Sequence, residues 1–340
     1  MEIGVMMRFT SNDVARLAGV SQSTVSRAFK GDTSMSPKTR DKVMAAAQKL
    51  SYVPNSFARN LTTQKSDIVA IVIGDLKNSF YTESLALFSR ELRGRGKHLL
   101  LFSVDAVTET DSAVREILEY QVDGIILTAA DASMTTAEIC INRRIPVATF
   151  NRYVPGTRVN SICCDNVGGG ETITDRLIEA GARSFVVVYG EKEATTNRDR
   201  LTGFERALKR AGIPKKNTRL LRGDYSYDGA FNAVAKCFAA GHRADAVLCL
   251  NDVMAMGAID ALRYEIGLDI PGEVMVAGFD DIPEAARPAY SLTTIRQPIE
   301  TMVNDTLDLL GLGERKTPST EVVRTIPGTL IERSTVRPRR

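Results

Sequence analysis

The hydrophobic positions of this chain follow two different patterns. Before about residue 50, short blocks of apolar residues recur at helical spacing, whereas from Ile68 onward β-rich apolar runs alternate with amphipathic stretches. The first pattern predicts two short helices, each with one buried face. The positions expected to face inward are Val14, Leu17 and Ala18 in the first block and Val25, Ala28 and Phe29 in the second.

Residues suited to helix ends flank these two blocks. Thr10, with Asp13 three residues later, has the spacing of a capping box, and Ser21 can cap the second helix. Gly19 lies between the blocks, where a tight turn needs a residue that tolerates positive φ. The segment from about residue 11 to 30 therefore predicts a helix-turn-helix, whose second helix can enter a major groove.

The second helix also carries a polar face opposite its apolar side. Gln22 stands one turn before Ser26, and Ser23 one turn before Arg27. Arginine can bond guanine bidentately and glutamine can bond adenine in the same way. A third helix is expected to close a small core. Its signals are Ser36 as the cap, Pro37 at the first position, and Val43, Ala46, Ala47 and Leu50 facing inward.

The second pattern predicts buried parallel strands joined by helices, and hence doubly wound α/β sheets. The predicted strands are residues 68–74, 98–104, 124–130, 185–190, 246–250 and 274–279. Ligands bind outside the carboxyl ends of strands in such sheets. The candidate residues there are Asn78, Ser79, Phe80, Tyr81, Thr128, Asn151, Arg152, Asn251, Asp252, Asp280 and Asp281, together with Arg200, which is expected to open a helix. Aromatic rings with Asn, Asp and Arg suit a polyhydroxylated molecule, although Asn and Asp are also ordinary loop and cap residues.

Length and charge add a domain boundary to this picture. A chain of 340 residues exceeds the size of one usual hydrophobic core, so two or three domains are expected. Residues 1–66 contain ten Lys or Arg and four Asp or Glu, a net charge of +6, which leaves −3 for the other 274 residues. A basic head on a mildly acidic body is consistent with polyanion binding by the head.

The remaining composition excludes several classes. The five cysteines show no CxxC spacing and the two histidines, His98 and His242, do not complete a ligand set, so we expect reduced packing cysteines, no metal and no cofactor. No apolar run suits a membrane span or a signal peptide, which favours a cytoplasmic protein without membrane contact.

An enzyme with a nucleotide-binding fold is the main rival. Gly168, Gly169 and Gly170 precede a predicted helix, but no glycine stands at position 173, so GxGxxG fails, as does a P-loop. No nucleophile has a plausible histidine partner. A sugar-transport protein would share the body but would need a signal peptide and no basic head. We therefore expect a binding protein whose output is DNA occupancy, and not an enzyme.

The head resembles the DNA-binding domain of the LacI/GalR (lactose-repressor) family. The resemblance rests on NDVARLAGVSQSTVSRAF followed by SPKTRDKVMAAAQKLSYVPNSFARNL, including the AGVS turn, TVSR, YxPN and the AxxL of the family's hinge. It implies Gln22, Ser23 and Arg27 as base readers and Thr10, Ser21, Thr24 and Ser26 as phosphate contacts. It also implies a hinge helix at residues 55–62, which forms in the DNA-bound dimer, with Asn55, Ala58 and Leu61 on DNA and Leu61 as the minor-groove wedge.

The body resembles the family's sensor domain, which is similar to periplasmic sugar-binding proteins. The segments NDVMAMGA, GFDD and LTTIRQP carry this resemblance. It implies effector contacts at Phe80, Tyr81, Asn151, Arg200, Asn251 and Asp280, and less closely at Thr128 and Gln297. No leucine heptads follow Ile331, so the tetramerising tail of the lactose repressor is absent, and Arg337–Arg340 reads as merely basic.

Together these features predict a three-helix helix-turn-helix head (1–54), a hinge and linker (55–66) and a two-lobed, doubly wound α/β effector domain (67–340). The first lobe is expected to comprise about 67–165 plus 293–325, and the second about 166–292. The predicted function is a homodimeric transcriptional regulator, a repressor of a pseudo-palindromic operator, controlled by a small, sugar-like effector. The effector's identity, its direction of action and the operator sequence stay open.

Overall fold

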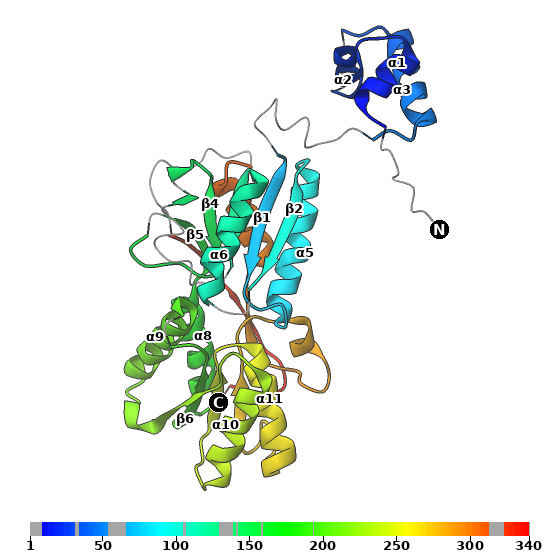
Figure 1. The fold of residues 1–340 in the computed structure, drawn as a ribbon. Coiled ribbons are helices and arrows are strands. Elements are labelled where there is room, and N and C mark those ends of the chain that lie inside the picture. Colours follow the sequence, from blue (N-terminus) through cyan, green and yellow to red (C-terminus); the bar gives the residue numbers. More distant parts are fainter. Residues whose placement is uncertain are drawn as a thin grey trace, which may run out of the picture. The chain divides into compact units, whose positions relative to one another are not determined.

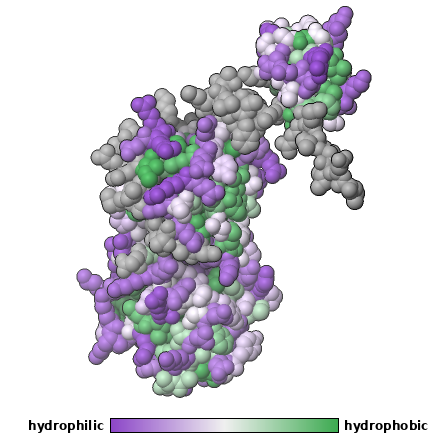
Figure 2. Space-filling view, viewed as in Figure 1, coloured by the Kyte–Doolittle hydropathy of each residue, from purple (hydrophilic) through white to green (hydrophobic). Residues whose placement is uncertain are grey.

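The computed structural model describes residues 9–30, 34–53, 66–104, 107–128, 139–140, 142–157, 159–192, 194–312 and 323–339. The chain forms two compact units, Met1–Ser66 and Asp67–Arg340 (Figure 1). Hydrophilic side chains cover much of the visible face of each unit (Figure 2). Within the described ranges, no helix has both the length and the apolar character of a membrane span.

The head consists of three short helices, α1 (Ser11–Ala18), α2 (Gln22–Lys30) and α3 (Pro37–Lys49). The predicted helix ends are present. The Asp13 N–H donates to Thr10 Oγ1 (3.4 Å) while the Thr10 N–H donates to Asp13 Oδ2 (2.9 Å), and Gly19 ends α1 at φ 64°. Ser21 Oγ accepts the Thr24 N–H and Ser36 Oγ accepts the Thr39 N–H, both at 3.2 Å. Local capping chemistry therefore sets where each helix begins.

One predicted core position in the head is wrong. The buried face of α1 consists of Val14, Ala15 and Ala18, whereas the Leu17 residue is 46% exposed. Ala15 and Leu17 both lie within a helical step of the Val14–Ala18 face, so spacing alone cannot choose between them. The packing of α2 and α3 selects the Ala15 side. Around it, Val25, Ala28, Val43, Ala46 and Ala47 complete the core.

The body contains two parallel sheets, which define its two lobes. The first has the order β11 (Val323–Ile326), β5 (Asn160–Cys164), β4 (Val147–Phe150), β3 (Gly124–Leu127), β1 (Ile68–Ile73), β2 (His98–Ser103). The second has the order β7 (Thr218–Arg222), β6 (Phe185–Tyr189), β8 (Ala246–Cys249), β9 (Met275–Ala277). A short antiparallel pair joins β10 (Thr294–Arg296) to β12 (Thr329–Ile331).

Helices cover these sheets. The helices of the first lobe are α5 (Ser79–Gly94), α6 (Val107–Ile117) and α12 (Ile299–Leu309), with the 3₁₀ turn η1 (Leu118–Tyr120). Those of the second are α8 (Asn166–Glu179), α9 (Thr195–Arg210), α10 (Tyr227–Ala239) and α11 (Asp252–Asp260), with the short turns η2 (Lys215–Asn217), η3 (Ala261–Ile266, a π-helix) and η4 (Pro283–Ala286). α8 packs along α9 and α10 along α11 (Figure 1). Arg200 lies inside α9 and does not open it.

The strand β2 is less buried than predicted. It pairs in parallel with β1 in the expected place, but it is the edge strand of the first sheet, and the Leu101 residue is 39% exposed. Its run of three leucines has the composition of a central strand. Strand order depends on contacts between distant segments, so composition did not reveal the edge position.

The C-terminal segment is structural, which the sequence did not reveal. After β12 the chain returns to the second lobe, where the Val276 N–H donates to the Thr335 carbonyl (3.0 Å) and the Thr335 side chain is fully buried. The Arg337 carbonyl accepts a 2.7 Å hydrogen bond from the Arg176 guanidinium. The interpretation of the tail as merely basic is therefore wrong for its described part.

Candidate functional sites

The polar face of α2 is exposed, as a DNA-reading helix requires. Gln22, Ser23 and Arg27 are exposed, and Thr24 and Ser26 are half-buried. Gln22 Nε2 donates to Ser11 Oγ at the start of α1 (3.3 Å), and Arg27 reaches Thr24 Oγ1 at 3.5 Å. These contacts are long and surface-exposed, so they pre-orient the two side chains without consuming their capacity to bond bases.

Of the other predicted DNA contacts, some are exposed at helix ends and others lie outside the described residues. Thr10 and Ser21 are exposed at the N-termini of α1 and α2, where backbone N–H groups and hydroxyls suit phosphate binding. Asn55, Ala58 and Leu61, predicted for the hinge, lie outside the described residues, so their roles stay predictions.

The body contains a cavity of about 230 Å³ at the carboxyl ends of both parallel sheets. From the first lobe, it is lined by residues that follow β1, β3 and β4; from the second, by residues that follow β6, β7, β8 and β9. This is the location expected for a ligand in doubly wound sheets. Of the predicted effector residues, it brings together Phe80, Tyr81, Thr128, Asn151, Arg200, Asn251 and Asp280.

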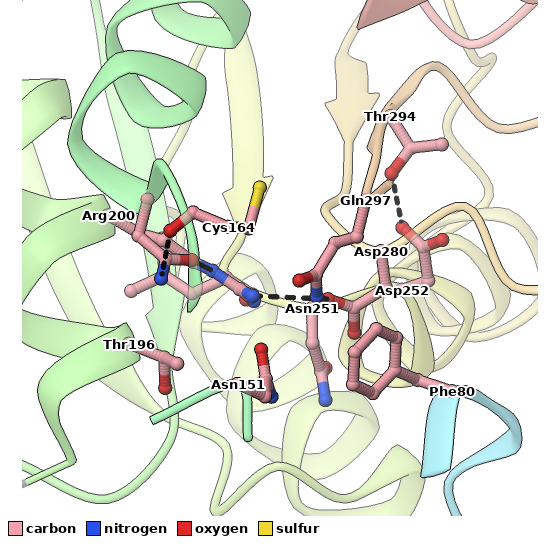
Figure 3. Close-up of polar contacts among 12 residues, drawn as sticks. Phe80, Asn151, Cys164, Thr196, Arg200, Asn251, Asp252, Asp280, Thr294 and Gln297 are labelled. Atoms are coloured by element: carbon pink, nitrogen blue, oxygen red, sulfur yellow. Dashed lines mark hydrogen bonds and ion pairs between the residues drawn. The ribbon is translucent and has the colours of Figure 1, made fainter. Parts of the chain in front are cut away.

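Several neighbours hold the Arg200 side chain at the cavity (Figure 3). Its Nε donates to Asn166 Oδ1 (2.8 Å), and Nη1 donates to the Leu250 carbonyl. Its Nη2 lies 3.2 Å from Asp280 Oδ1, and its guanidinium stacks 3.7 Å from the ring centroid of Phe279. Each of its three nitrogens has a partner and one face of the guanidinium lies on an aromatic ring, so Arg200 is held in a fixed orientation and in turn holds Asp280 in place.

Gln297 lies behind the cavity and does not line it. Its Nε2 donates to Asp280 Oδ1 at 2.7 Å, so the amide fixes the same carboxylate that Arg200 pairs with. Both partners are almost fully buried. Burial raises the pKa of Asp280, while Arg200 and Gln297 oppose that rise by favouring the charged form. Gln297 therefore contributes to this site by holding Asp280.

The remaining predicted residues divide into caps and cavity contacts. Asn251 Oδ1 caps α11 by accepting the Met254 N–H (2.8 Å), and the Thr128 hydroxyl donates to the Val72 carbonyl (3.1 Å). Asn151 Nδ2 donates to the Tyr81 hydroxyl (3.1 Å), whereas the buried Oδ1 of Asn151 has no hydrogen-bond partner within the described structure. A buried acceptor without a partner marks a place where a ligand donor fits.

Four of the residues that line this cavity have an unusual backbone conformation. Asn151 (φ 71°), Asp224 (φ 51°), Tyr225 (φ 54°) and Asp280 (φ 130°) all have positive φ, a conformation that non-glycine residues rarely adopt. Each follows the end of a strand, where the turn aims its side chain toward the cavity. Strain of this kind persists only where the surrounding structure enforces it, and it is common at binding sites.

Asp252 lies directly behind the cavity and is completely buried. Its Oδ1 accepts the Thr294 hydroxyl (2.6 Å; Figure 3), and its Oδ2 accepts the Ile282 N–H (3.0 Å). Burial, together with the nearby negative charge of Asp280, raises the pKa of Asp252 to about 7. Thr294 is on β10, so this carboxyl group links the second lobe to a strand that crosses between the lobes.

Comparison with known proteins agrees with both halves of this description. Residues 10–55 match the family described as bacterial regulatory proteins, lacI family, and residues 174–336 match a periplasmic binding protein-like domain. The HTH-type transcriptional regulator CelR of Thermobifida fusca is 31% identical over 310 residues, covering 89% of this chain and 91% of that protein. The chain belongs to the LacI family.

Solved structures of LacI-family regulators share its fold. A Lac repressor dimer bound to operator and the anti-inducer ONPF superimposes with a TM-score of 0.85 at 26% identity, covering 97% of this chain and 99% of that one. A complex of CelR with cellobiose has a TM-score of 0.71 at 28% identity, covering 96% and 100%. The chain is thus a DNA-binding transcriptional regulator with a two-lobed effector domain.

Several cavity residues of this LacI-family chain were not predicted. Tyr225, Thr196, Asp224 and Glu191 line the cavity from the second lobe. The Tyr225 hydroxyl lies 3.2 Å from Thr196 Oγ1. The Arg152 guanidinium carbon lies over the Tyr225 ring, 5.4 Å from its centroid. Gly190 admits this ring, because a Cβ there would meet it at 2.3 Å. Asp224 and Tyr225 follow β7, a half-exposed edge strand that lacks the apolar run of the other strands, so the sequence did not mark their position. Glu191 follows β6, which was predicted, and its position after that strand could have revealed it.

Proposed function

We propose that this LacI-family chain is a repressor that binds a pseudo-palindromic operator as a homodimer through α2, and that a small carbohydrate in the body cavity controls its operator affinity. In this proposal residues 1–54 read DNA, residues 55–66 form the hinge, and residues 67–340 bind effector and dimerise. Gln22, Ser23 and Arg27 contact bases; Thr10, Ser21, Thr24 and Ser26 contact phosphates; and Asn55, Ala58 and Leu61 act at the minor groove.

One observation carries the effector half of the proposal. The cavity combines an aromatic face with amide, carboxylate and guanidinium groups held in fixed orientations, and the buried Asn151 Oδ1 faces it without a partner. Hydroxyl groups both donate and accept, so a polyol can satisfy such a mixed set. At about 230 Å³ the cavity is small for a ligand pocket, which favours a ligand of monosaccharide size.

The relatives support this proposal and give no support to an enzyme. CelR is known in complex with cellobiose, and the Lac repressor is known as a dimer on its operator. In this chain, charged groups at the cavity pair with each other, as Arg200 does with Asp280. We therefore propose that ligand binding has DNA occupancy as its output and that the protein acts in the cytoplasm, where the operator is.

Selection from random double-stranded DNA with the full chain, followed by anisotropy titrations, tests the DNA half. Arg27→Ala should weaken the selected site by roughly 1–3 kcal/mol per half-site and relax base preference there, because a bidentate reader is lost. Arg16→Ala removes the same charge from exposed α1 and should affect selected and random DNA alike. An Arg27→Ala variant that keeps the parent's site and affinity would refute the assignment of α2.

A further inference from the structure

We infer that Asp67, Lys97 and Asp123 form a fixed junction between the linker and the body, and that Lys97 is thereby a positioning residue for operator binding. The junction sets the direction in which each linker leaves the body, and with it the half-site spacing that the dimer prefers. This inference rests on the proposed function and adds the part of the body that positions the two heads.

The three residues occupy equivalent places in the first sheet. Asp67 immediately precedes β1, Lys97 precedes β2 and Asp123 precedes β3. These strands are neighbours and run parallel, in the order β3, β1, β2. The amino ends of parallel strands meet at the same edge of a sheet, so the three side chains come together there. The cavity lies at the opposite edge, since its lining residues follow the carboxyl ends of β1 and β3.

The Lys97 ammonium group bridges the two carboxylates. Its Nζ lies 2.9 Å from Asp67 Oδ1 and 2.8 Å from Asp123 Oδ2. The side chains of Lys97 and Asp123 are 16% and 13% exposed, so solvent screens their attraction only in part. Burial lowers the pKa of Lys97, but the hydrogen bonds to Asp123 and Asp67 together outweigh it and raise the pKa above its ordinary value. Without Lys97, two carboxylates would remain beside each other and repel.

The backbone of Asp67 is strained, and the same neighbours hold it. Its φ is 57°, a left-handed conformation that non-glycine residues rarely adopt. The Asp67 N–H donates to Asp123 Oδ2 (3.1 Å), and the Asp67 carbonyl accepts the His98 N–H (2.7 Å). With Lys97 on the carboxylate, the N–H, the carbonyl and the side chain of Asp67 all have partners. Such a conformation persists only where its surroundings enforce it, so the direction in which the chain enters β1 is fixed.

The strand β1 connects this junction with the cavity. It begins directly after Asp67, and Gly74 and Asp75, which follow its other end, line the cavity. Its six residues span about 20 Å, and it is hydrogen-bonded to β2 on one side and to β3 on the other. A strand held on both sides moves as a rigid element of its lobe. A fixed junction therefore passes a movement of the first lobe on to the linker.

The position of the junction matters because one dimer carries two heads. Each head is joined to its body through residues 55–66, so the two junctions limit which pair of half-sites both heads can reach together. One base pair inserted between the half-sites moves the second half-site by about 3.4 Å and turns it by about 35°. A dimer with fixed junctions should reject the lengthened site, whereas loosened junctions should accept it more readily.

Anisotropy titrations with the full chain test the inference. The two DNA duplexes are the site that the parent selects and the same site with one base pair inserted between its half-sites. The measured quantity is the spacing penalty, which is the ratio of the two affinities. For the parent we expect a penalty of at least about 30-fold. For Lys97→Met it should fall below about 5-fold, and Lys97→Arg should restore it, because arginine keeps the charge between the carboxylates.

A second variant loosens the junction without leaving a carboxylate unpaired. Asp67→Gly keeps the pair of Lys97 and Asp123, and glycine tolerates the positive φ, so the variant should fold and should also lower the spacing penalty. Two matched controls should keep the penalty of the parent. Lys215→Met removes a 2.7 Å ion pair of the second lobe, and Arg144→Gly replaces an exposed residue of the first lobe that has φ 58°.

Thermal unfolding shows which variants are folded, and where Lys97→Met is not, Asp67→Gly decides by itself. A folded Lys97→Met variant with the spacing penalty of the parent overturns the inference, even if its overall affinity falls, and so does such an Asp67→Gly variant. A parent that binds a single half-site as tightly as the selected pair shows a different failure, because the proposed dimeric operator binding is then wrong.

Discussion

At the scale of single residues, the body cavity depends on pairs of buried groups that fix each other. Arg200 and Asp280 are both less than 5% exposed, and each has further partners that hold its orientation. A buried ion pair is costly to break from one side, because the remaining charge loses its partner in a low-dielectric site. Under the proposed function, Asp280 accepts a hydrogen bond from a ligand hydroxyl, and this pairing fixes its orientation.

Asp280→Asn should therefore weaken effector binding by roughly 10- to 100-fold, since a charge-assisted hydrogen bond is replaced by a neutral one and Arg200 loses its counter-charge. Calorimetry with a monosaccharide that a thermal-shift screen of the full chain identifies as a ligand measures this. Sedimentation should show the same assembly for variant and parent. Undiminished affinity would mean that Asp280 does not contact the effector.

Asp252 adds a pH dependence whose sign is set by its raised pKa. Burial and the negative charge of Asp280 raise the pKa of Asp252 from its ordinary value of 3.8 to about 7, so between those pH values the folded state holds the proton more tightly than the unfolded state does. The free energy of unfolding therefore falls as the pH rises from about 4 to about 7. In Asp252→Asn the Oδ1 and Nδ2 groups can still serve Ile282 and Thr294 without a charge.

The melting temperature of Asp252→Asn, relative to the parent, should accordingly increase from pH 5 to pH 8. Asp245→Asn is the control, because burial of Asp245 is outweighed by hydrogen bonds from Arg183 and Ser184, which hold its pKa below the ordinary value. That variant should lose stability equally at pH 5 and pH 8. A constant difference between Asp252→Asn and the parent over this range would contradict the assignment.

At the scale of elements, the glycines of α8 serve helix packing. They were expected to precede a helix, but they lie inside α8, which begins at Asn166. A Cβ at Gly170 would meet the Arg200 carbonyl at 2.4 Å, and one at Gly203 would meet the Val167 carbonyl at 2.1 Å. The backbones of α8 and α9 thus touch directly. Because Arg200 belongs to α9, this crossing also positions the cavity.

Gly203→Ala should destabilise the body by about 1–3 kcal/mol or more, since the obstacle on both sides is backbone and cannot rotate away. Gly94→Ala is the matched control: it is an exposed glycine in α5 with nothing within 4 Å of the place that a Cβ would occupy, and alanine there should stabilise by about 0.5–1 kcal/mol. Urea unfolding of the two variants measures the difference. Equal stabilities would show that the two helices separate easily.

At the scale of the whole molecule, charge and topology both separate the head from the body. The basic head and the mildly acidic body form separate compact units, each with its own buried core. The body's topology is self-contained, because its last strands and its C-terminal segment return to the two lobes. Binding of effector should therefore not require the head, whereas specific binding of DNA should.

A fragment of residues 67–340 should fold, dimerise and bind the effector with the affinity of the full chain, yet show no specific operator binding. Sedimentation, calorimetry and anisotropy measure these three properties. The full chain is the control in each assay. A monomeric fragment would contradict dimerisation through the body, and retained operator specificity would contradict the assignment of DNA reading to the head.

The sequence by itself determined the features that depend on neighbours along the chain. Thr10, Gly19 and Ser36 predicted helix ends correctly, because caps and tight turns are made within a few residues. The apolar runs beginning at Ile68 and Phe185 predicted central strands, because a strand buried on both faces must be apolar throughout. The resemblance to LacI-family segments placed seven effector candidates at one cavity.

Only the tertiary structure decided the features that depend on distant segments. In the fold, Leu17 is exposed while Ala15 is buried, and β2 is an edge strand. Gln297 bonds Asp280 and does not line the cavity, whereas Tyr225 does. Each outcome depends on which surface a remote element covers, and no local pattern encodes that choice. The buried C-terminal segment at Thr335 has the same cause: its polar sequence resembles a free tail, and only the partners it meets on the second lobe make it part of the fold.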